Sequence, residues 1–135
     1  AAAFDPTDKT VLILGAGGAS KAVAAAVRGA RKITVLPRQE VPNAANYSCD
    51  LLINATPIGM YPLVDASPLQ GTIPGNVVFD MVYNPAITRL LGSAADQGKT
   101  VIQGTAMFLA QAARQFEIWT GHRAPAEIFG EKSYS

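Results

Sequence analysis

The feature that most constrains this chain is a glycine-rich segment between a short apolar run and an alanine-rich run. Residues 10–14 read TVLIL, a β-branched and apolar sequence typical of a buried strand. The segment 15–20 reads GAGGAS, and the alanine-rich residues 19–28 follow up to Gly29, which can close a helix. This order predicts a strand, a tight turn and a helix.

Apolar runs recur along the chain in an order that predicts alternating strands and helices. We expect further strands over 32–36, 50–55, 76–82 and 99–102, and helices over 85–97, 106–120 and 125–129. Asn84 fits the N-cap of the helix over 85–97, and Pro85 fits its first position. Residues 37–49 are polar and contain two prolines, so we expect a loop there. The alternation predicts one α/β domain over residues 1–135, of the Rossmann type, with a doubly wound parallel sheet and helices on both faces.

The glycine-rich segment has the spacing G-x-G-x-x-(G/A/S), which binds phosphate where a strand turns into a helix. Gly15 permits the tight turn, and Gly17 lets the backbone approach a pyrophosphate. The N-terminus of the helix would offer free N–H groups and a positive dipole to the phosphates. The residues expected at the pyrophosphate are Gly15, Ala16, Gly17, Gly18, Ala19 and Ser20. The alternative is a glycine turn needed only for packing.

The end of the second strand indicates which dinucleotide would bind. An NAD site places Asp or Glu about 20 residues past the glycines, on the ribose 2′-hydroxyl. Here Arg38 stands at the strand end, and the first acid, Glu40, comes two residues later. A guanidinium suits a 2′-phosphate through paired, charge-assisted hydrogen bonds, so the sequence favours NADP over NAD. The alternative is a solvated surface arginine.

Polar residues near other strand ends are further candidates. Ligands of parallel α/β sheets bind beyond the carboxyl ends of the strands, so Asn54 and Thr56 would share one cleft with Tyr83 and Gly104. Asn54 and Thr56 could equally cap a strand end. Gln111 lies in a mostly apolar helical run, and its spacing leaves open whether it is a core amide or a group facing the cleft.

Composition excludes several other classes of function. A net charge of +1 is not the excess of positive charge that would indicate binding to nucleic acid or to an anionic membrane. No apolar run reaches the roughly 20 residues of a membrane span, and we see no signal peptide. The single cysteine, Cys49, excludes a disulfide framework and a cysteine-based zinc site, so we expect no metal and a reducing, cytoplasmic location. The single histidine, His122, follows the last long helix, which leaves no Ser-His-Asp set for a hydrolase.

Four motifs, in order along the chain, resemble one known family. They are VLILGAGGASKA, DLLINATPIGM, VVFDMVYNP and GTAMFLAQAARQFEIWTG. Together they resemble the C-terminal domain of shikimate dehydrogenase, and the stretch 59–129 is most similar to the form fused to dehydroquinate dehydratase. This family reduces 3-dehydroshikimate to shikimate with NADPH in aromatic amino-acid biosynthesis. The resemblance therefore implies an NADP-dependent oxidoreductase.

The resemblance also implies a role for each matching residue. The glycine-rich segment would hold the pyrophosphate, and Arg38 would face the adenosine 2′-phosphate. The cofactor ribose and phosphates would be lined by Asn54, Ala55 and Thr56. Met81 and Gly104 would flank the nicotinamide, and the substrate, shikimate or 3-dehydroshikimate, would be touched by Tyr83 and Gln111.

The chain departs from the family pattern in two ways. The family's catalytic Lys–Asp pair lies in a separate N-terminal substrate domain, so we expect no catalytic residue in this chain and no activity from it alone. Residues 37–49 are also short for the family, so the fold should be shortened between the second and third strands, with part of the 2′-phosphate pocket missing. The alternatives are a non-catalytic nucleotide-binding or regulatory module of the same fold, and a quinate/shikimate dehydrogenase.

Overall fold

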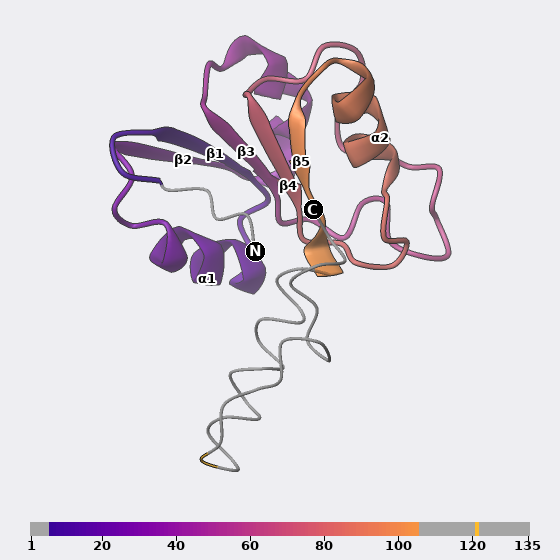
Figure 1. Cartoon of the computed structure of the whole chain (residues 1–135), viewed down its shortest axis with the longest axis horizontal. Helices are drawn as coiled ribbons and strands as arrows, with labels where there is room; N and C mark the ends of the chain where they lie inside the picture. Colours follow the sequence, from indigo (N-terminus) through magenta and orange to yellow (C-terminus); the bar gives the residue numbers. More distant parts are fainter. Residues whose placement is uncertain (1–5, 106–120, 122–135) are drawn as a thin grey trace.

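A computed structural model describes residues 6–105 and 121 (Figure 1). Five strands form one sheet, and two α-helices and one 3₁₀-helix pack against it. The strands are β1 (Thr10–Leu14), β2 (Lys32–Leu36), β3 (Leu51–Asn54), β4 (Val77–Asp80) and β5 (Thr100–Ile102). The helices are α1 (Gly18–Ala26), η1 (Arg38–Asn46) and α2 (Arg89–Asp96). The predicted strands and helices of this part of the chain are therefore present: β1 and β2 have the predicted bounds, and the ends of the others differ by at most four residues.

The sheet has the strand order β2-β1-β3-β4-β5, and every neighbouring pair is parallel. The chain leaves β1 toward β2 and then crosses back to place β3 on the other side of β1. In an open parallel sheet, the point where the order reverses opens a crevice at the carboxyl ends of the strands. Here that point lies between β1 and β3, so the glycine-rich segment after β1 faces the loop after β3. The predicted Rossmann-type α/β class is confirmed.

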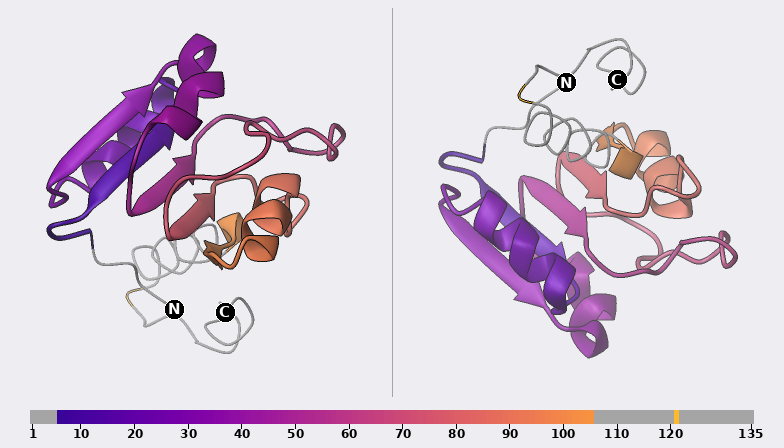
Figure 2. Two further views of the ribbon diagram at one scale, coloured as in Figure 1. Left: turned by 90° about the horizontal axis from the view of Figure 1, so that it is seen from above. Right: turned by 90° about the horizontal axis from the view of Figure 1, so that it is seen from below.

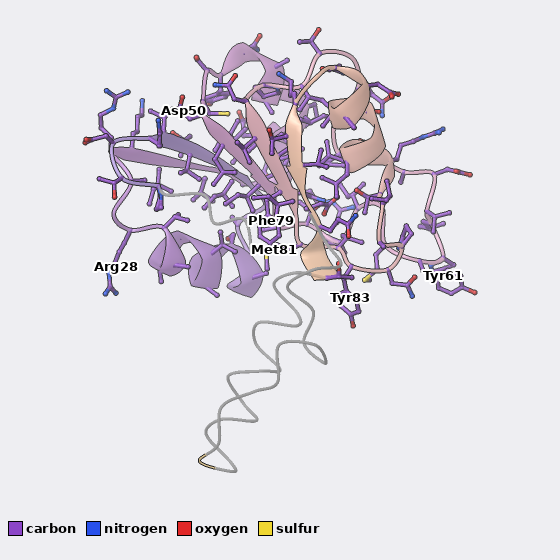
Figure 3. The ribbon with its side chains drawn as sticks, viewed as in Figure 1. Arg28, Asp50, Tyr61, Phe79, Met81 and Tyr83 are labelled. Carbon is purple, nitrogen blue, oxygen red and sulfur yellow. The ribbon has the colours of Figure 1, made fainter. Side chains whose placement is uncertain are left out.

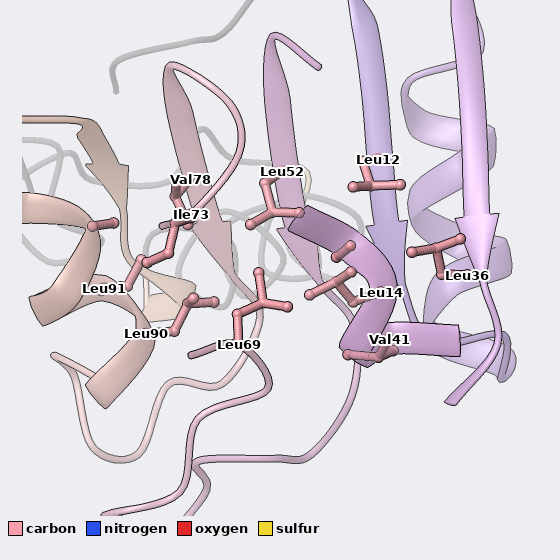
Figure 4. Close-up of a cluster of buried hydrophobic side chains, with 12 residues drawn as sticks. Leu12, Leu14, Leu36, Val41, Leu52, Leu69, Ile73, Val78, Leu90 and Leu91 are labelled. Carbon is pink, nitrogen blue, oxygen red and sulfur yellow. The ribbon is translucent and has the colours of Figure 1, made fainter. Parts of the chain in front are cut away.

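Each face of the sheet carries its own apolar core. Val11 and Ile13 of β1 join Val23 of α1 in a cluster on one face. The alternate residues of β1, Leu12 and Leu14, point into the second cluster with α2 and η1 (Figure 4). Side chains alternate across a strand, and β1 is apolar and buried at every position after Thr10, as expected for a strand covered on both faces. Helices therefore lie on both faces, as predicted (Figure 2).

The prediction of a loop over 37–49 is wrong for most of that stretch, because residues 38–46 form the 3₁₀-helix η1. In a 3₁₀-helix, side chains three residues apart lie on the same side. Val41 and Ala44 are so spaced, and both are buried in the core beneath β1 and β2. The link from β2 to β3 contains no strand, so β2 is an edge of the sheet and the predicted shortening is confirmed.

Helix α2 begins at Arg89, four residues later than predicted, with Thr88 rather than Asn84 as its N-cap. The hydroxyl of Thr88 accepts a hydrogen bond from the backbone N–H of Leu91 at 3.2 Å. The carbonyl of Asn84 instead accepts the N–H of Tyr61 at 2.8 Å, which joins two loops. A tertiary contact therefore outweighs the local Asn-Pro signal.

Some expectations fall outside the described residues. These are the helices over 106–120 and 125–129, together with Gln111 and His122. Gly104 and Thr105 have helical backbone at the edge of the described range. Among residues 6–105 and 121, no helix is long and apolar enough to cross a membrane, and no group of His, Cys, Asp and Glu is placed to hold a metal ion.

Candidate dinucleotide site

The turn after β1 depends on glycine at its first position. Gly15 has a φ of +99°, and its N–H donates to the carbonyl of Leu36 at 2.7 Å. A Cβ on Gly15 would lie 2.9 Å from Cγ2 of Thr56, in the loop after β3. The left-handed backbone and this close approach both exclude a side chain. Gly15 therefore holds the turn closed against the neighbouring loop.

The next part of the turn is open. A Cβ on Gly17 or Gly18 would meet no atom of the described structure within 4 Å, and residues 16–19 are exposed. Gly17 is the N-cap of α1, and no side chain caps the helix. The first N–H groups of a helix lack partners within it and carry its positive dipole, so they suit an anion. Packing alone does not explain two bare glycines at this exposed position.

Ser20 is turned away from the opening. It is 2% exposed, and its hydroxyl donates to the carbonyl of Gly17 at 2.8 Å. The side chain thus fixes the first turn of α1 against β1. Of the six predicted pyrophosphate residues, the structure offers the backbone of Ala16 through Ala19 to a ligand and uses Gly15 and Ser20 to shape the turn.

The strand ladder continues into the loops beside the turn. The N–H of Ala55 donates to the carbonyl of Leu14 at 2.9 Å, and the N–H of Met81 donates to that of Asn54 at 3.1 Å. These bonds bring the loops after β1, β3 and β4 to one edge of the sheet. In Figure 3, Met81 and Tyr83 lie at this edge, and Asp50 lies at the opposite one. The structure therefore brings together the predicted residues of the three loops.

Asn54 is fully buried, and its side chain is hydrogen-bonded entirely within the chain. Its Oδ1 accepts the N–H of Thr56 at 3.1 Å and the hydroxyl of Thr56 at 2.6 Å. Its Nδ2 donates to the carbonyl of Ile58 at 3.3 Å and to Oδ1 of Asp80 at 3.0 Å. An amide has two donors and an acceptor oxygen with two lone pairs, so all its positions are filled. The side chain of Asn54 thus shapes the loop and has no hydrogen-bonding position left for a ligand.

Gly104 meets the loop after β4 so closely that a side chain cannot fit. A Cβ at this position would lie 2.7 Å from each of three carbonyl oxygens, those of Asp80, Met81 and Val82. The backbone at Gly104 therefore packs directly on the loop that contains Met81. The two residues predicted to flank a nicotinamide, Met81 and Gly104, are neighbours.

Gly104→Ala should lower the free energy of unfolding by about 1–3 kcal/mol, because backbone carbonyls cannot move aside as a flexible side chain can. Gly92→Ala is the matched control: Gly92 lies in α2, and its added Cβ would meet nothing within 4 Å. Alanine is the better helix former, so this control should gain about 0.5–1 kcal/mol. Urea denaturation of both variants measures the difference. Equal stabilisation of the two would contradict the packing described for Gly104.

Arg38 lies at the first position of η1, directly after β2 and Pro37. Its side chain is exposed and makes no hydrogen bond or ion pair with a described residue. Because β2 neighbours β1, Arg38 and the glycine turn share the carboxyl edge of the sheet. The guanidinium is therefore available to an anion there.

Sequence reasoning predicted Tyr83, which is 50% exposed, but missed the exposed apolar side chains of the loop beside it. Tyr61 is 65% exposed on that loop, which is joined to the loop of Tyr83 through Asn84 (Figure 3). Met60 and Leu63 are also exposed. The only sequence signal is an apolar cluster inside a proline-rich loop.

Other features lie away from this edge. A hollow of about 460 Å³ between α2 and residues 64–65 contains none of the predicted site residues. Cys49 lies near the opposite edge, where burial raises its pKa to about 11. A thiol with so high a pKa is almost wholly protonated near neutral pH, which fits the inert role expected for it.

Comparison with known proteins shows which family the chain resembles. Residues 104–129 match the family model of the shikimate 5′-dehydrogenase C-terminal domain. A shikimate dehydrogenase (NADP(+)) of Methanopyrus kandleri is 36% identical over 95% of this chain and 55% of its own length. The bifunctional 3-dehydroquinate dehydratase/shikimate dehydrogenase of Arabidopsis thaliana is also 36% identical, over 90% of this chain and 24% of its own length. The chain thus spans about half the length of the stand-alone relative, and the fused form is among the relatives.

Structural comparison agrees. The crystal structure of the shikimate 5-dehydrogenase of Thermus thermophilus, in complex with NADP(H) and shikimate, superposes with a TM-score of 0.74 at 29% identity. The superposition covers 90% of this chain and 53% of the Thermus chain. The resemblance seen in the four motifs is confirmed: in sequence and in fold, this chain is a relative of the C-terminal domain of shikimate dehydrogenases.

Proposed function

We propose that this chain is the NADP-binding domain of a shikimate dehydrogenase. The observation that carries the proposal is the open, uncapped start of α1, together with an exposed arginine at the end of β2 that pairs with no described residue. A helix start without a capping side chain suits a pyrophosphate, and a guanidinium suits a 2′-phosphate. The names of the relatives and the NADP(H) complex of the Thermus enzyme support the same cofactor.

The proposed reaction is the reversible reduction of 3-dehydroshikimate to shikimate. When bound, NADPH supplies the hydride. The backbone of residues 16–19 would hold the pyrophosphate, and Arg38 would hold the 2′-phosphate. Met81 and Gly104 would flank the nicotinamide, with Tyr83 and Gln111 on the substrate side. The acid–base pair that moves the hydroxyl proton would come from a substrate domain outside this chain.

The 135-residue chain should bind NADPH roughly tenfold more tightly than NADH, because an exposed guanidinium gains about 1–2 kcal/mol from charge-assisted hydrogen bonds to the 2′-phosphate. Arg38→Asp should remove this preference. Arg28→Asp is the matched control, since Arg28 is also exposed but lies beyond the far end of α1 (Figure 3). Isothermal titration calorimetry with both cofactors measures the ratio. Equal affinities of the unmutated chain for NADPH and NADH would sink the proposed specificity.

A further inference from the structure

The carboxylate at the end of β4 is buried, and none of the roles proposed so far involves it. Asp80 is 0% exposed. Its Oδ1 accepts the N–H of Val82 at 3.0 Å and the Nδ2 of Asn54 at 3.0 Å. Its Oδ2 accepts the hydroxyl of Thr88 at 2.7 Å. Burying a carboxylate without partners costs several kcal/mol, and the three donors offset that cost for Asp80. The hydrogen bonds also connect Asp80 to the groups that donate them.

The three donors belong to three different elements. Asn54 ends β3 and holds the loop through Thr56 and Ile58. Val82 lies in the loop after β4, between Met81 and Tyr83. Thr88 caps α2 through the N–H of Leu91. A single side chain thus fixes two of the loops at the carboxyl edge to each other and to the start of a helix.

The connection lies on the nicotinamide side of the proposed cofactor site. It reaches the loop after β4, beside which the nicotinamide would lie, and the loop after β3, which would line the cofactor ribose and phosphates. No hydrogen bond of the group formed by Asn54, Thr56, Asp80, Val82 and Thr88 reaches residues 15–20 or Arg38. The glycine turn has hydrogen bonds of its own, from the N–H of Gly15 to Leu36 and from the hydroxyl of Ser20 to Gly17, and it packs against the methyl group of Thr56.

We propose that Asp80 is a positioning residue for the nicotinamide half of the site, through its hydrogen bonds to the loops after β3 and β4. The proposal rests on the function proposed above. It means that Asp80 does not touch the cofactor but sets the backbone of residues 80–82, against whose carbonyls Gly104 is packed. Affinity for the nicotinamide half of NADPH then depends on Asp80, and affinity for the adenosine half does not.

Two substitutions separate geometry from charge. Asp80→Asn keeps the shape and can still accept two bonds at its oxygen, but its amide nitrogen meets the hydroxyl of Thr88, whose proton loses its acceptor. Thr88→Val removes that hydroxyl and keeps the volume, whereas Thr88→Ser keeps the hydroxyl. Asp96→Asn is the charge control, because Asp96 is an exposed carboxylate at the end of α2.

The experiment titrates the 135-residue chain with NADPH and with adenosine 2′,5′-bisphosphate, which lacks the nicotinamide half. Asp80→Asn and Thr88→Val should weaken NADPH binding about tenfold, the effect of one disturbed charged hydrogen bond. Both variants should leave the bisphosphate affinity within about twofold, and Thr88→Ser and Asp96→Asn should match the unmutated chain for both ligands. A merely structural role predicts equal losses for NADPH and the bisphosphate, and that result would overturn the proposal.

A second measurement needs no cofactor. Hydrogen exchange of the Thr56 and Val82 amides should quicken at least tenfold in Asp80→Asn, while the amides of β1 stay protected. Unchanged exchange at both amides would overturn the proposal even if the chain binds no NADPH. Failure of the unmutated chain to bind either ligand would instead refute the proposed function, so the two failures are distinguishable.

Discussion

Shikimate oxidation by the 135-residue chain alone is expected to be undetectable. The carboxyl edge of the sheet can orient a cofactor, but the acid–base pair that would take the substrate's hydroxyl proton is proposed to lie in the substrate domain. General acid–base catalysis is worth about 10²–10⁴-fold, and holding two reactants in position about 7–11 kcal/mol. A chain that supplies only one side of the active site loses most of the acid–base contribution and most of the positioning contribution. NADPH formation from shikimate and NADP⁺, followed by absorbance, measures the activity.

The control joins this chain to the substrate domain of a stand-alone shikimate dehydrogenase, and this fusion should turn over. An inactive fusion that still binds NADPH would favour the alternative of a non-catalytic module. Comparable turnover by the isolated chain and the fusion would mean that the reacting groups lie within these 135 residues. Lys21, Asp80 and Tyr83 would then be the first side chains to substitute.

Gly17→Val should weaken NADPH binding at least 100-fold and leave the chain folded. The backbone at Gly17 has φ −84° and ψ −164°, an extended conformation that valine adopts, and an added Cβ meets nothing within 4 Å. The free energy of unfolding should therefore change by no more than about 1 kcal/mol. The methyl groups would occupy the space into which the pyrophosphate must come to reach the backbone.

Gly29→Val is the matched control, because Gly29 is exposed, has equal room for a Cβ and lies beyond the opposite end of α1. It should bind NADPH as the unmutated chain does. Calorimetry for binding and urea denaturation for stability test both variants. Normal binding by a folded Gly17→Val chain would show that the glycine serves the turn alone.

Much of the fold could be predicted because its signals are local. The apolar run of β1, the glycine turn and the alanine-rich helix follow one another in sequence, and parallel topology then places the later loops at the same edge. The position of Arg38 after β2 follows from the same reasoning.

The remainder depended on contacts between distant residues. The start of α2 is set by Thr88, whose hydroxyl is held by Asp80 of β4, and no local pattern near residue 88 reveals that partner. Asn54 looked equally like a ligand group and a strand cap, and only the positions of Thr56, Ile58 and Asp80 show that its side chain is fully used within the chain. The fold of η1 likewise depends on the burial of Val41 and Ala44 beneath the sheet.

The edge position of β2 has a consequence for how a dinucleotide would be held. Since β2 is the outermost of the described strands, the adenosine end of the cofactor would lie at the exposed edge of the sheet, with solvent on its outer side. Little apolar area could be buried around the adenine there, so attraction between Arg38 and the 2′-phosphate would supply much of the binding free energy. Exposed charges are screened within about 10 Å at ordinary ionic strength. We therefore expect added salt to lower the cofactor affinity of this protein more than it lowers the affinity of a protein with an enclosed adenine pocket.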